Sequence, residues 1–258
     1  MTTRRRFLAG LGCAGGSLFG YSSFNGSYGK PTIDKDIEII GHRGASAKFS
    51  DNSIEGIRYA GKHGADAVEL DIRRTADDRL VLNHNPFVMN ISGAQTIGDV
   101  TYNELLETTD RISTFSEAMS VVKKYDMELV AGMKEPHNSE YIWNAVKEAN
   151  YADNSYMSMW NRDLEDHLVD PERTMIVTAA PNTDLIESAK EYGIDSVMCH
   201  YIETGIDAFI DYAHLNGIKA GYWTLSESRE DLVAGLSKDP DVIMTNRPKQ
   251  AVELIRGD

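Results

Sequence analysis

The sequence predicts a (β/α)8 barrel, and three observations support this fold class. Short apolar segments typical of buried strands recur from residue 37 to residue 246, in most cases every 20 to 30 residues. Helical patterns separate most of them and end near a glycine or a polar turn, as in residues 53–64 and 114–125. Eight such units in about 230 residues match the size of this barrel, whose functional groups lie at the carboxyl ends of the strands.

The expected strands are residues 37–40, 67–72, 127–133, 154–159, 174–180, 195–199, 219–225 and 241–246. A doubly wound open sheet is the alternative α/β architecture, and it would bind a nucleotide through a glycine-rich first turn. The first turn here reads GHRG and lacks the GxGxxG spacing. We therefore favour a TIM barrel, formed by a single domain over residues 30–258.

An antiparallel hairpin is expected directly after the second strand. The segment AVELDIRRTADDRLVLNHN holds two extended runs whose connection is too short for a crossover helix. If Asp77 and Asp78 form a two-residue turn, the register sets Asp71 opposite His84. Because strand side chains alternate, Glu69 and Asp71 then share one face, a spacing that lets two carboxylates hold one cation.

The N-terminal segment is interpreted as an export signal. Residues 3–20 read TRRRFLAGLGCAGGSLFG, with Arg4 and Arg5 ahead of an apolar stretch, as in a twin-arginine signal; a frayed basic tail is the alternative. That stretch is shorter than the ~20 residues of a membrane-spanning helix, so no transmembrane span is expected. We expect residues 1–29 to be signal and spacer and the protein to be periplasmic or extracellular. Cys13 is a candidate lipid anchor, although Gly10 stands where a lipobox usually has Leu.

The charge balance limits the classes of partner. The chain has 26 Lys and Arg against 40 Asp and Glu, a formal net charge of -14, and residues 1–30 contain no acidic residue. The remainder is therefore strongly acidic, which argues against binding nucleic acid or an anionic membrane. A small anion can still be held by a few local cations, because nearby charges act more strongly than distant screened ones.

Chemistry-bearing side chains gather at the carboxyl ends of the expected strands. One pair follows the first strand, two carboxylates lie at the end of the second, a histidine ends the hairpin, and a lysine and a tryptophan end two others. These residues are His42, Arg43, Glu69, Asp71, His84, Lys134 and Trp223. Because the ends of parallel strands meet at one rim of a barrel, we expect these side chains to form one site.

Several ordered motifs together carry a family resemblance. They are GHRGAS, SDNSIEGIRYAGKHGADAVELDIRRTADDRLVLNHN, DVTYNELLE, STFSEAM, the strand ending in Lys134, YWTL and VIMTNRP. Over roughly residues 37–255 the chain resembles the glycerophosphodiester phosphodiesterase family, including the spacing from His42 to Glu69 and to His84. The resemblance implies a TIM barrel, a divalent cation and hydrolysis of small-molecule glycerophosphodiesters. It also implies that His42 and His84 act as general acid and base.

The residue types agree with this chemistry. Phosphodiester cleavage needs charge neutralised on the non-bridging oxygens, a base for the attacking hydroxyl and an acid for the leaving alkoxide. Arg43 and Lys134 suit the phosphate oxygens. Glu69 and Asp71 suit a hard cation, Ca2+ or Mg2+. We expect Trp223 to shape the pocket for the alcohol group, or else to pack in the core.

The sequence also departs from the family pattern. The family typically has Glu-x-Lys, with the Glu as a metal ligand, where this chain has Gly132, Met133 and Lys134. Family members usually have acidic residues where this chain has Asn85 and Asn246. Each lost carboxylate removes a negative charge that holds the ion, so we expect a weak or altered metal site.

Two alternatives to a metal-assisted hydrolase remain open. One is a non-catalytic phosphate-ester binding protein, which the missing carboxylate favours and the presence of both histidines disfavours. The other is a metal-independent lyase or transferase that forms a cyclic phosphate by attack of a neighbouring hydroxyl. The substrate's alcohol, the role of His200 and the oligomeric state are left unassigned.

Overall fold

The computed structural model describes residues 36–90, 93–109, 111–201, 204–225 and 228–257. The expected signal and spacer at residues 1–29, with Cys13, lie outside these ranges and stay predictions. None of the helices within the described ranges combines the length and apolar character needed to cross a bilayer.

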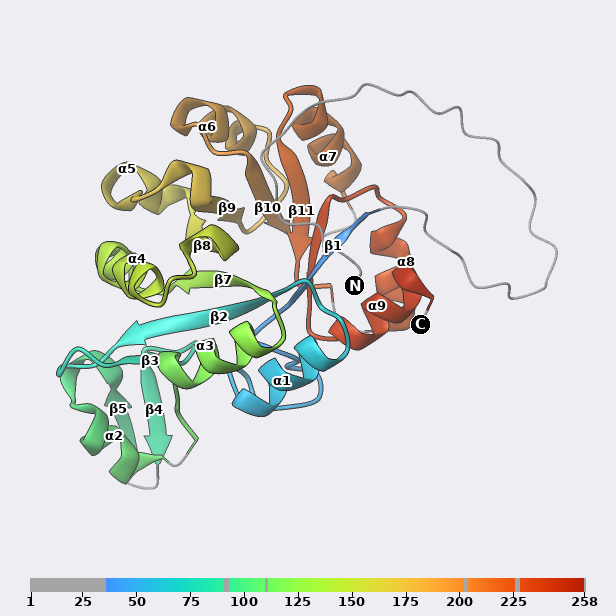
Figure 1. The fold of residues 1–258 in the computed structure, drawn as a ribbon. Helices are drawn as coiled ribbons and strands as arrows, with labels where there is room; N and C mark the ends of the chain where they lie inside the picture. The colour runs from blue at the N-terminus through green and yellow to red at the C-terminus, as the bar shows by residue number, and fades with distance from the viewer. Residues whose placement is uncertain (1–35, 91–92, 110, 202–203, 226–227, 258) are drawn as a thin grey trace.

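Eight parallel strands close into a barrel, which confirms the predicted fold class (Figure 1). They are β1 (Glu38–Gly41), β2 (Ala67–Arg74), β7 (Glu128–Met133), β8 (Ser155–Trp160), β9 (Thr174–Thr178), β10 (Ser196–His200), β11 (Lys219–Trp223) and β12 (Val242–Thr245). Each of these eight strands pairs with the next of the eight along the chain, and β1 pairs with both β12 and β2. The sheet therefore has no open edge within the barrel. All eight strands expected from the apolar segments are present.

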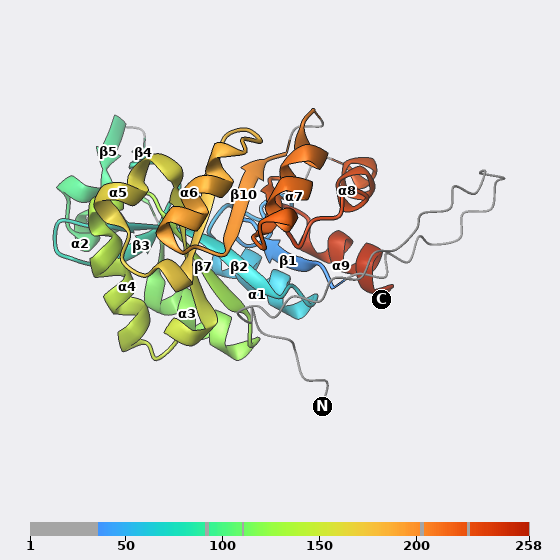
Figure 2. The same ribbon diagram turned by 90° about the horizontal axis from the view of Figure 1, so that it is seen from above.

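Helices surround the barrel, as both ribbon views show (Figures 1 and 2), and one further helix lies apart from this ring, at the lower left of Figure 1. The helices are α1 (Ile54–Lys62), α2 (Tyr102–Thr108), α3 (Phe115–Lys124), α4 (Ser139–Glu148), α5 (Leu164–His167), α6 (Asp184–Tyr192), α7 (Ile206–Leu215), α8 (Arg229–Leu236) and α9 (Pro248–Arg256). Side-chain caps fix several of their starts. Thr114, for example, accepts a hydrogen bond from the backbone N–H of Glu117, whose carboxylate accepts one from the backbone N–H of Thr114.

Strand alternation separates two apolar layers. Outward side chains such as Ile39, Val68 and Leu70 pack with the helices in one buried cluster. Inward side chains such as Ile40 and Val130 fill the barrel in a second cluster. Because every second residue of a strand points inward, the inward-facing residues that follow these along each strand lie at the carboxyl rim. The polar site therefore lies directly above the apolar interior of the barrel.

The predicted hairpin after the second strand is present, but its register is one residue different. Strand β3 (Leu80–Leu82) pairs antiparallel to β2, with Arg74 opposite Leu80 and Ile72 opposite Leu82. The loop has three residues rather than two, because Asp78 adopts a left-handed conformation (φ 65°) and the backbone N–H of Thr75 donates to Arg79. The expectation that Asp71 lies opposite His84 is therefore wrong.

In the observed register Asn83 takes the place expected for His84. The backbone N–H of Asn83 donates to the carbonyl of Asp71 at 3.0 Å. His84 follows Asn83 and lies beyond the last backbone hydrogen bond to β2.

A small excursion, which the sequence pattern did not predict, follows the hairpin. Strands β4 (Phe87–Asn90) and β5 (Gly93–Thr96) form a two-stranded ribbon, and α2 packs beside it. The excursion projects from one side of the barrel, at the lower left of Figure 1. Strand β6 (Ser113–Thr114) then pairs with β3 and returns the chain to the barrel.

Candidate active site

The GHRG turn after β1 carries the first two site residues. A Cβ at Gly41 would collide with the carbonyl oxygen of Gly44, and Gly44 has a φ of 91°, so both positions require glycine. Arg43 itself adopts a left-handed conformation with φ 50°. Such a conformation is uncommon for a residue with a side chain, and it needs surrounding contacts to maintain it.

Asp71 is the centre of the polar network, and it is fully shielded from solvent. Its Oδ1 lies 2.8 Å from Nζ of Lys134, and its Oδ2 lies 3.1 Å from Nε of Arg43. Burial alone would raise the pKa of Asp71, but the charges of Lys134 and Arg43 outweigh it and lower the pKa to about 2. Asp71 is therefore ionised at neutral pH and fixes two cationic side chains.

Asn52 supports this carboxylate, and the sequence pattern did not indicate it as a site residue. Its Nδ2 donates to Oδ2 of Asp71 at 2.8 Å, and its Oδ1 accepts the backbone N–H of Asp71 at 3.0 Å. Its own backbone N–H donates to the carbonyl of Arg43 at 2.9 Å. Asn52 has a φ of 58°, a conformation that asparagine tolerates better than most residues. Its neighbour Asp51 pairs with Nη1 of Arg43 at 2.7 Å.

Glu69 lies beside this network and is 4% exposed. Its Oε2 accepts the backbone N–H of Arg43 at 3.0 Å. Burial, followed by repulsion from Asp71, raises the pKa of Glu69 to about 8. A Cβ added at Gly132 would lie 2.7 Å from Oε1 of Glu69, so the Glu69 carboxyl occupies space that a side chain at position 132 would need.

His42 is oriented by an amide rather than a carboxylate. Its Nδ1 lies 2.6 Å from Oδ1 of Asn246, which also accepts the hydroxyl of Ser46. Because Oδ1 can only accept, Nδ1 of His42 carries the proton and Nε2 is left as a proton acceptor. Burial and the charge of Arg43 lower the pKa of His42 to about 4, so this ring is neutral at neutral pH.

His84 follows β3 and is held through its backbone. The buried guanidinium of Arg73 donates to the carbonyls of Asn83 (Nε, 3.0 Å) and His84 (Nη2, 2.6 Å), and to Oε1 of Glu135 (Nη1, 2.9 Å). Arg73 therefore ties the His84 segment to the segment that carries Lys134. Burial lowers the pKa of His84 below its ordinary value, although nearby Asp71 opposes the change.

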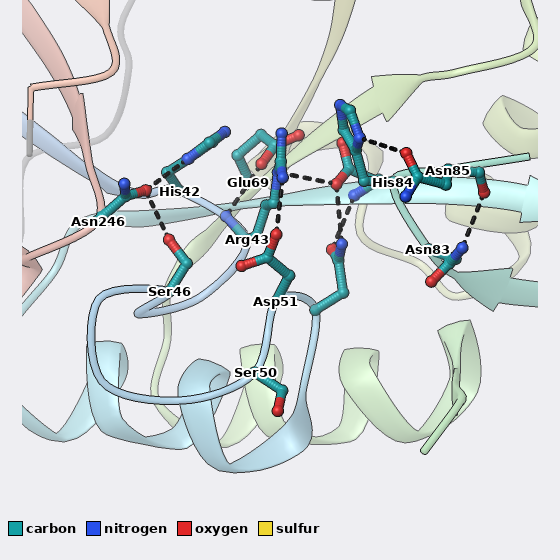
Figure 3. A network of polar contacts seen from close by, with 12 residues as sticks. His42, Arg43, Ser46, Ser50, Asp51, Glu69, Asn83, His84, Asn85 and Asn246 are labelled. Carbon is teal, nitrogen blue, oxygen red and sulfur yellow. Dashed lines mark hydrogen bonds and ion pairs between the residues drawn. The ribbon is translucent and has the colours of Figure 1, made fainter. Parts of the chain in front are cut away.

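A single pocket brings most of the predicted residues together. Figure 3 shows His42, from the β1–α1 loop, and His84, from the segment after β3, on either side of Glu69. The pocket has a volume of about 80 Å3, and its lining includes His42, Arg43, Glu69, His84, Lys134 and Trp223. Asp71 contacts two cationic side chains of the pocket, Arg43 and Lys134. All seven residues predicted from the sequence thus belong to one site.

Aromatic side chains form one wall of this pocket. Trp160, which was not among the residues predicted for the site, packs edge-to-face with Trp223 at 5.8 Å between ring centroids. His200 packs edge-to-face on Trp223 at 5.0 Å. The sequence signal for Trp160 is its position at the end of a strand, on the same face as inward-facing Tyr156.

The sequence profile of the glycerophosphoryl diester phosphodiesterase family matches residues 42–250. The chain belongs to this family. The expected enzyme class, a phosphoric diester hydrolase, is thereby confirmed. A glycerophosphodiester phosphodiesterase from Caldanaerobacter subterraneus subsp. tengcongensis is 24% identical over 238 residues, which cover 84% of this chain and 97% of the relative.

Solved structures of the family share the fold. A glycerophosphodiester phosphodiesterase from Thermotoga maritima is similar with a TM-score of 0.72 and 24% identity, covering 84% of this chain and 98% of that chain. An Oleispira antarctica phosphodiesterase, solved with its product sn-glycerol-3-phosphate, is similar with a TM-score of 0.69 and 15% identity, covering 84% and 96%. At these sequence identities, the structural similarity shows the shared barrel fold alone.

Members of the glycerophosphoryl diester phosphodiesterase family generally use a divalent cation. Among the residues that the structure describes, no group of three or more His, Cys, Asp or Glu side chains is arranged to hold a metal ion. Both oxygens of Asp71 face cationic side chains, and position 132 offers no oxygen from a side chain. The donor set, as arranged, does not fit a divalent cation, for which Ca2+ would take about 6 to 8 oxygens.

Proposed function

We propose that this chain hydrolyses glycerophosphodiesters to an alcohol and a phosphomonoester, with His42 and His84 as the acid–base pair. The observation that carries the proposal is the meeting of two histidines and two cationic side chains in one pocket at the carboxyl rim of the barrel. A barrel of the same fold, from Oleispira antarctica, was solved with sn-glycerol-3-phosphate as its product.

Arg43 and Lys134 are suited to bind the phosphate. Their side chains are 19% and 23% exposed, and each is anchored on Asp71 through one nitrogen. Each therefore keeps further N–H donors for the non-bridging oxygens of a phosphodiester. Charge-assisted hydrogen bonds of this type strengthen as negative charge develops in the transition state.

The two histidines have different roles in this mechanism. Nε2 of neutral His42 takes a proton from the attacking water while the water oxygen forms a bond to phosphorus. The bond from phosphorus to the leaving oxygen breaks, and its electron pair stays on that oxygen. His84 then donates a proton to this oxygen and releases the alcohol. A bound phosphodiester anion favours the protonated form of His84 that this step requires.

The aromatic wall is suited to the alcohol part of the substrate. Trp223 and Trp160 offer apolar surface beside the phosphate-binding cations. The acidic surface charge of the chain fits a small-molecule substrate rather than nucleic acid.

We also propose that the protein is exported to the periplasm or the cell exterior. The support is the twin-arginine pattern at Arg4 and Arg5, with Cys13 as a candidate lipid anchor. Expression with and without residues 1–29, followed by cell fractionation, tests this. Export of the truncated protein would contradict it.

The hydrolase proposal is tested with protein beginning at residue 30. Glycerophosphocholine and glycerophosphoethanolamine are assayed with Ca2+, with Mg2+ and with chelator, because the prediction of a weak Ca2+ or Mg2+ site at Glu69 and Asp71 stays open. We expect turnover that is abolished in His84→Ala. No turnover of either diester in any condition would favour a binding protein, and a cyclic phosphate product would favour a cyclising lyase.

A further inference from the structure

Both carboxylate oxygens of Asp71 already contact cationic side chains. Its Oδ1 lies 2.8 Å from Nζ of Lys134, and its Oδ2 lies 3.1 Å from Nε of Arg43. The same Oδ2 accepts a hydrogen bond from Asn52 at 2.8 Å. The backbone N–H of Asp71 also donates to Oδ1 of Asn52, so Asn52 holds both the backbone and the carboxylate of Asp71. A divalent cation at Asp71 would have to compete with these partners for the carboxylate.

The neighbouring carboxylates do not compensate. Oε2 of Glu69 accepts the backbone N–H of Arg43, which leaves Oε1 as its one uncommitted oxygen. Asp51 pairs with Nη1 of Arg43 at 2.7 Å. Gly132 stands where the family resemblance implies a ligand. The uncommitted carboxylate oxygens, Oε1 of Glu69 and Oδ1 of Asp51, are far fewer than Ca2+ takes, and they leave Mg2+ few protein ligands.

The local charges also oppose a dication. Arg43 and Lys134 both lie within ion-pair distance of Asp71, so two positive charges already flank this carboxylate. An added divalent ion would lie close to two positive side chains in a partly buried pocket, where screening by solvent is weak. A bound phosphodiester, in contrast, meets two cations held in place by a buried carboxylate.

We propose that this site works without a resident divalent cation, and that Lys134 and Arg43, fixed on Asp71, supply the positive charge that acts on the phosphate. The proposal rests on the proposed function for the nature of the substrate, but its statement about metal binding stands on the donor set alone. Fixed N–H donors stabilise developing charge without reorganisation, which is the contribution that a metal would otherwise make.

Metal binding is measured directly by titration calorimetry of the metal-stripped protein with Ca2+ and with Mg2+. We expect no saturable binding by the wild-type chain below about 1 mM, the weak end of protein calcium sites. Saturable binding of either ion below that concentration would overturn the proposal. Thermal unfolding with and without each ion is the second readout, and a stabilising shift that saturates in the same range would overturn it too.

A matched set of variants tests the physical reason. The double variant Gly132→Glu with Lys134→Met adds a carboxylate and frees Oδ1 of Asp71, and we expect it to gain saturable Ca2+ binding. The control, Gly132→Gln with Lys134→Met, has nearly the same volume without the added charge and should not bind. Position 132 can accept a side chain only if the flexible end of Glu69 moves. If either variant does not fold, the wild-type titration decides alone.

Turnover in chelator separates this proposal from the proposed function. We expect rates with glycerophosphocholine in chelator and in excess Ca2+ to agree within about twofold. Activity that requires Ca2+ or Mg2+ would overturn metal independence while leaving hydrolysis intact. Absence of turnover in every condition would overturn the proposed hydrolysis, and the titration would still decide the question of metal binding.

Discussion

Lys134 and Asp71 form an ion pair of 2.8 Å at the base of the pocket, and Asp71 is completely buried. The sequence predicted both residues for the site, one for phosphate and the other for metal. Their pairing means that Asp71 positions a cationic side chain. This relationship connects the fold, through β2 and β7, to the chemistry of phosphate binding.

Lys134→Met should lower both activity and stability. It removes a cation from the phosphate and leaves a buried carboxylate with fewer partners, although Arg43 and Asn52 remain. We expect kcat/KM to fall by about 100-fold or more, and the free energy of unfolding to fall by about 2 kcal/mol. Lys249→Met, which breaks the exposed pair with Glu253 on α9, is the control and should change stability by less than about 1 kcal/mol. Equal losses in the two variants would contradict the role of Lys134.

Asn246→Asp should shift the acidic limb of the pH–rate profile upward. A carboxylate beside Nδ1 favours the protonated ring and raises the pKa of His42 from about 4. His42 is active as a base when deprotonated, so activity is lost as the pH falls through its pKa, and the loss should begin at higher pH in the variant. The measurement is kcat/KM between about pH 4 and pH 9.

Asn85→Asp is the counterpart on the other ring. Oδ1 of Asn85 lies 3.3 Å from Nδ1 of His84, and a carboxylate there should raise the pKa of His84. His84 is active as an acid when protonated, so activity is lost as the pH rises through its pKa. The basic limb should therefore move to higher pH. If Asn246→Asp moved the basic limb instead, or Asn85→Asp the acidic limb, His42 would be the general acid and His84 the general base.

Arg73→Met should reduce catalysis without abolishing substrate binding. Arg73 holds the carbonyls of Asn83 and His84, so its loss frees the ring that donates the proton. We expect kcat to fall by about 10- to 100-fold with KM changed by less than about threefold. Arg74→Met is the control, because Arg74 pairs with Asp78 and stacks on Tyr141, away from the histidine. A similar loss in the control would contradict a positioning role for Arg73.

Glu38→Gln should stabilise the protein at alkaline pH. Burial, repulsion from Glu128 and repulsion from Asp66 raise the pKa of Glu38 well above its ordinary value. Because a raised carboxyl pKa means that the folded state binds the proton more tightly, stability is lost as the pH rises above the ordinary pKa of about 4.5. The stabilisation by Gln should therefore be larger at pH 8 than near pH 4, as measured by urea unfolding. Exposed Glu191→Gln is the control, and a pH-independent effect at position 38 would contradict the account.

The barrel could be predicted because its strands are short apolar segments, separated for the most part by helical patterns. The register of the hairpin could not, since it depends on the left-handed conformation of Asp78, and a type of turn with an additional residue is not visible in the apolar pattern. The β4–β5 ribbon was missed because its strands are short and mostly exposed.

The residues of the site also divide into those that the sequence could predict and those that it could not. Residues at strand ends, such as His42 and Lys134, could be predicted because the barrel brings strand ends together. Asn52 and Arg73 could not, because their roles depend on where a loop backbone places an amide and on which carbonyls a buried guanidinium reaches. The ion pairs of Asp71 likewise follow from tertiary geometry, while the absence of a carboxylate at position 132 is visible in the sequence.

The most direct test of the account is phosphorus-31 NMR of glycerophosphocholine incubated with wild-type protein in chelator, with His84→Ala beside it. The account predicts that a phosphomonoester signal grows with the wild-type chain and stays absent with the variant. A phosphodiester signal that remains unchanged in chelator and is consumed only after Ca2+ or Mg2+ is added would contradict it.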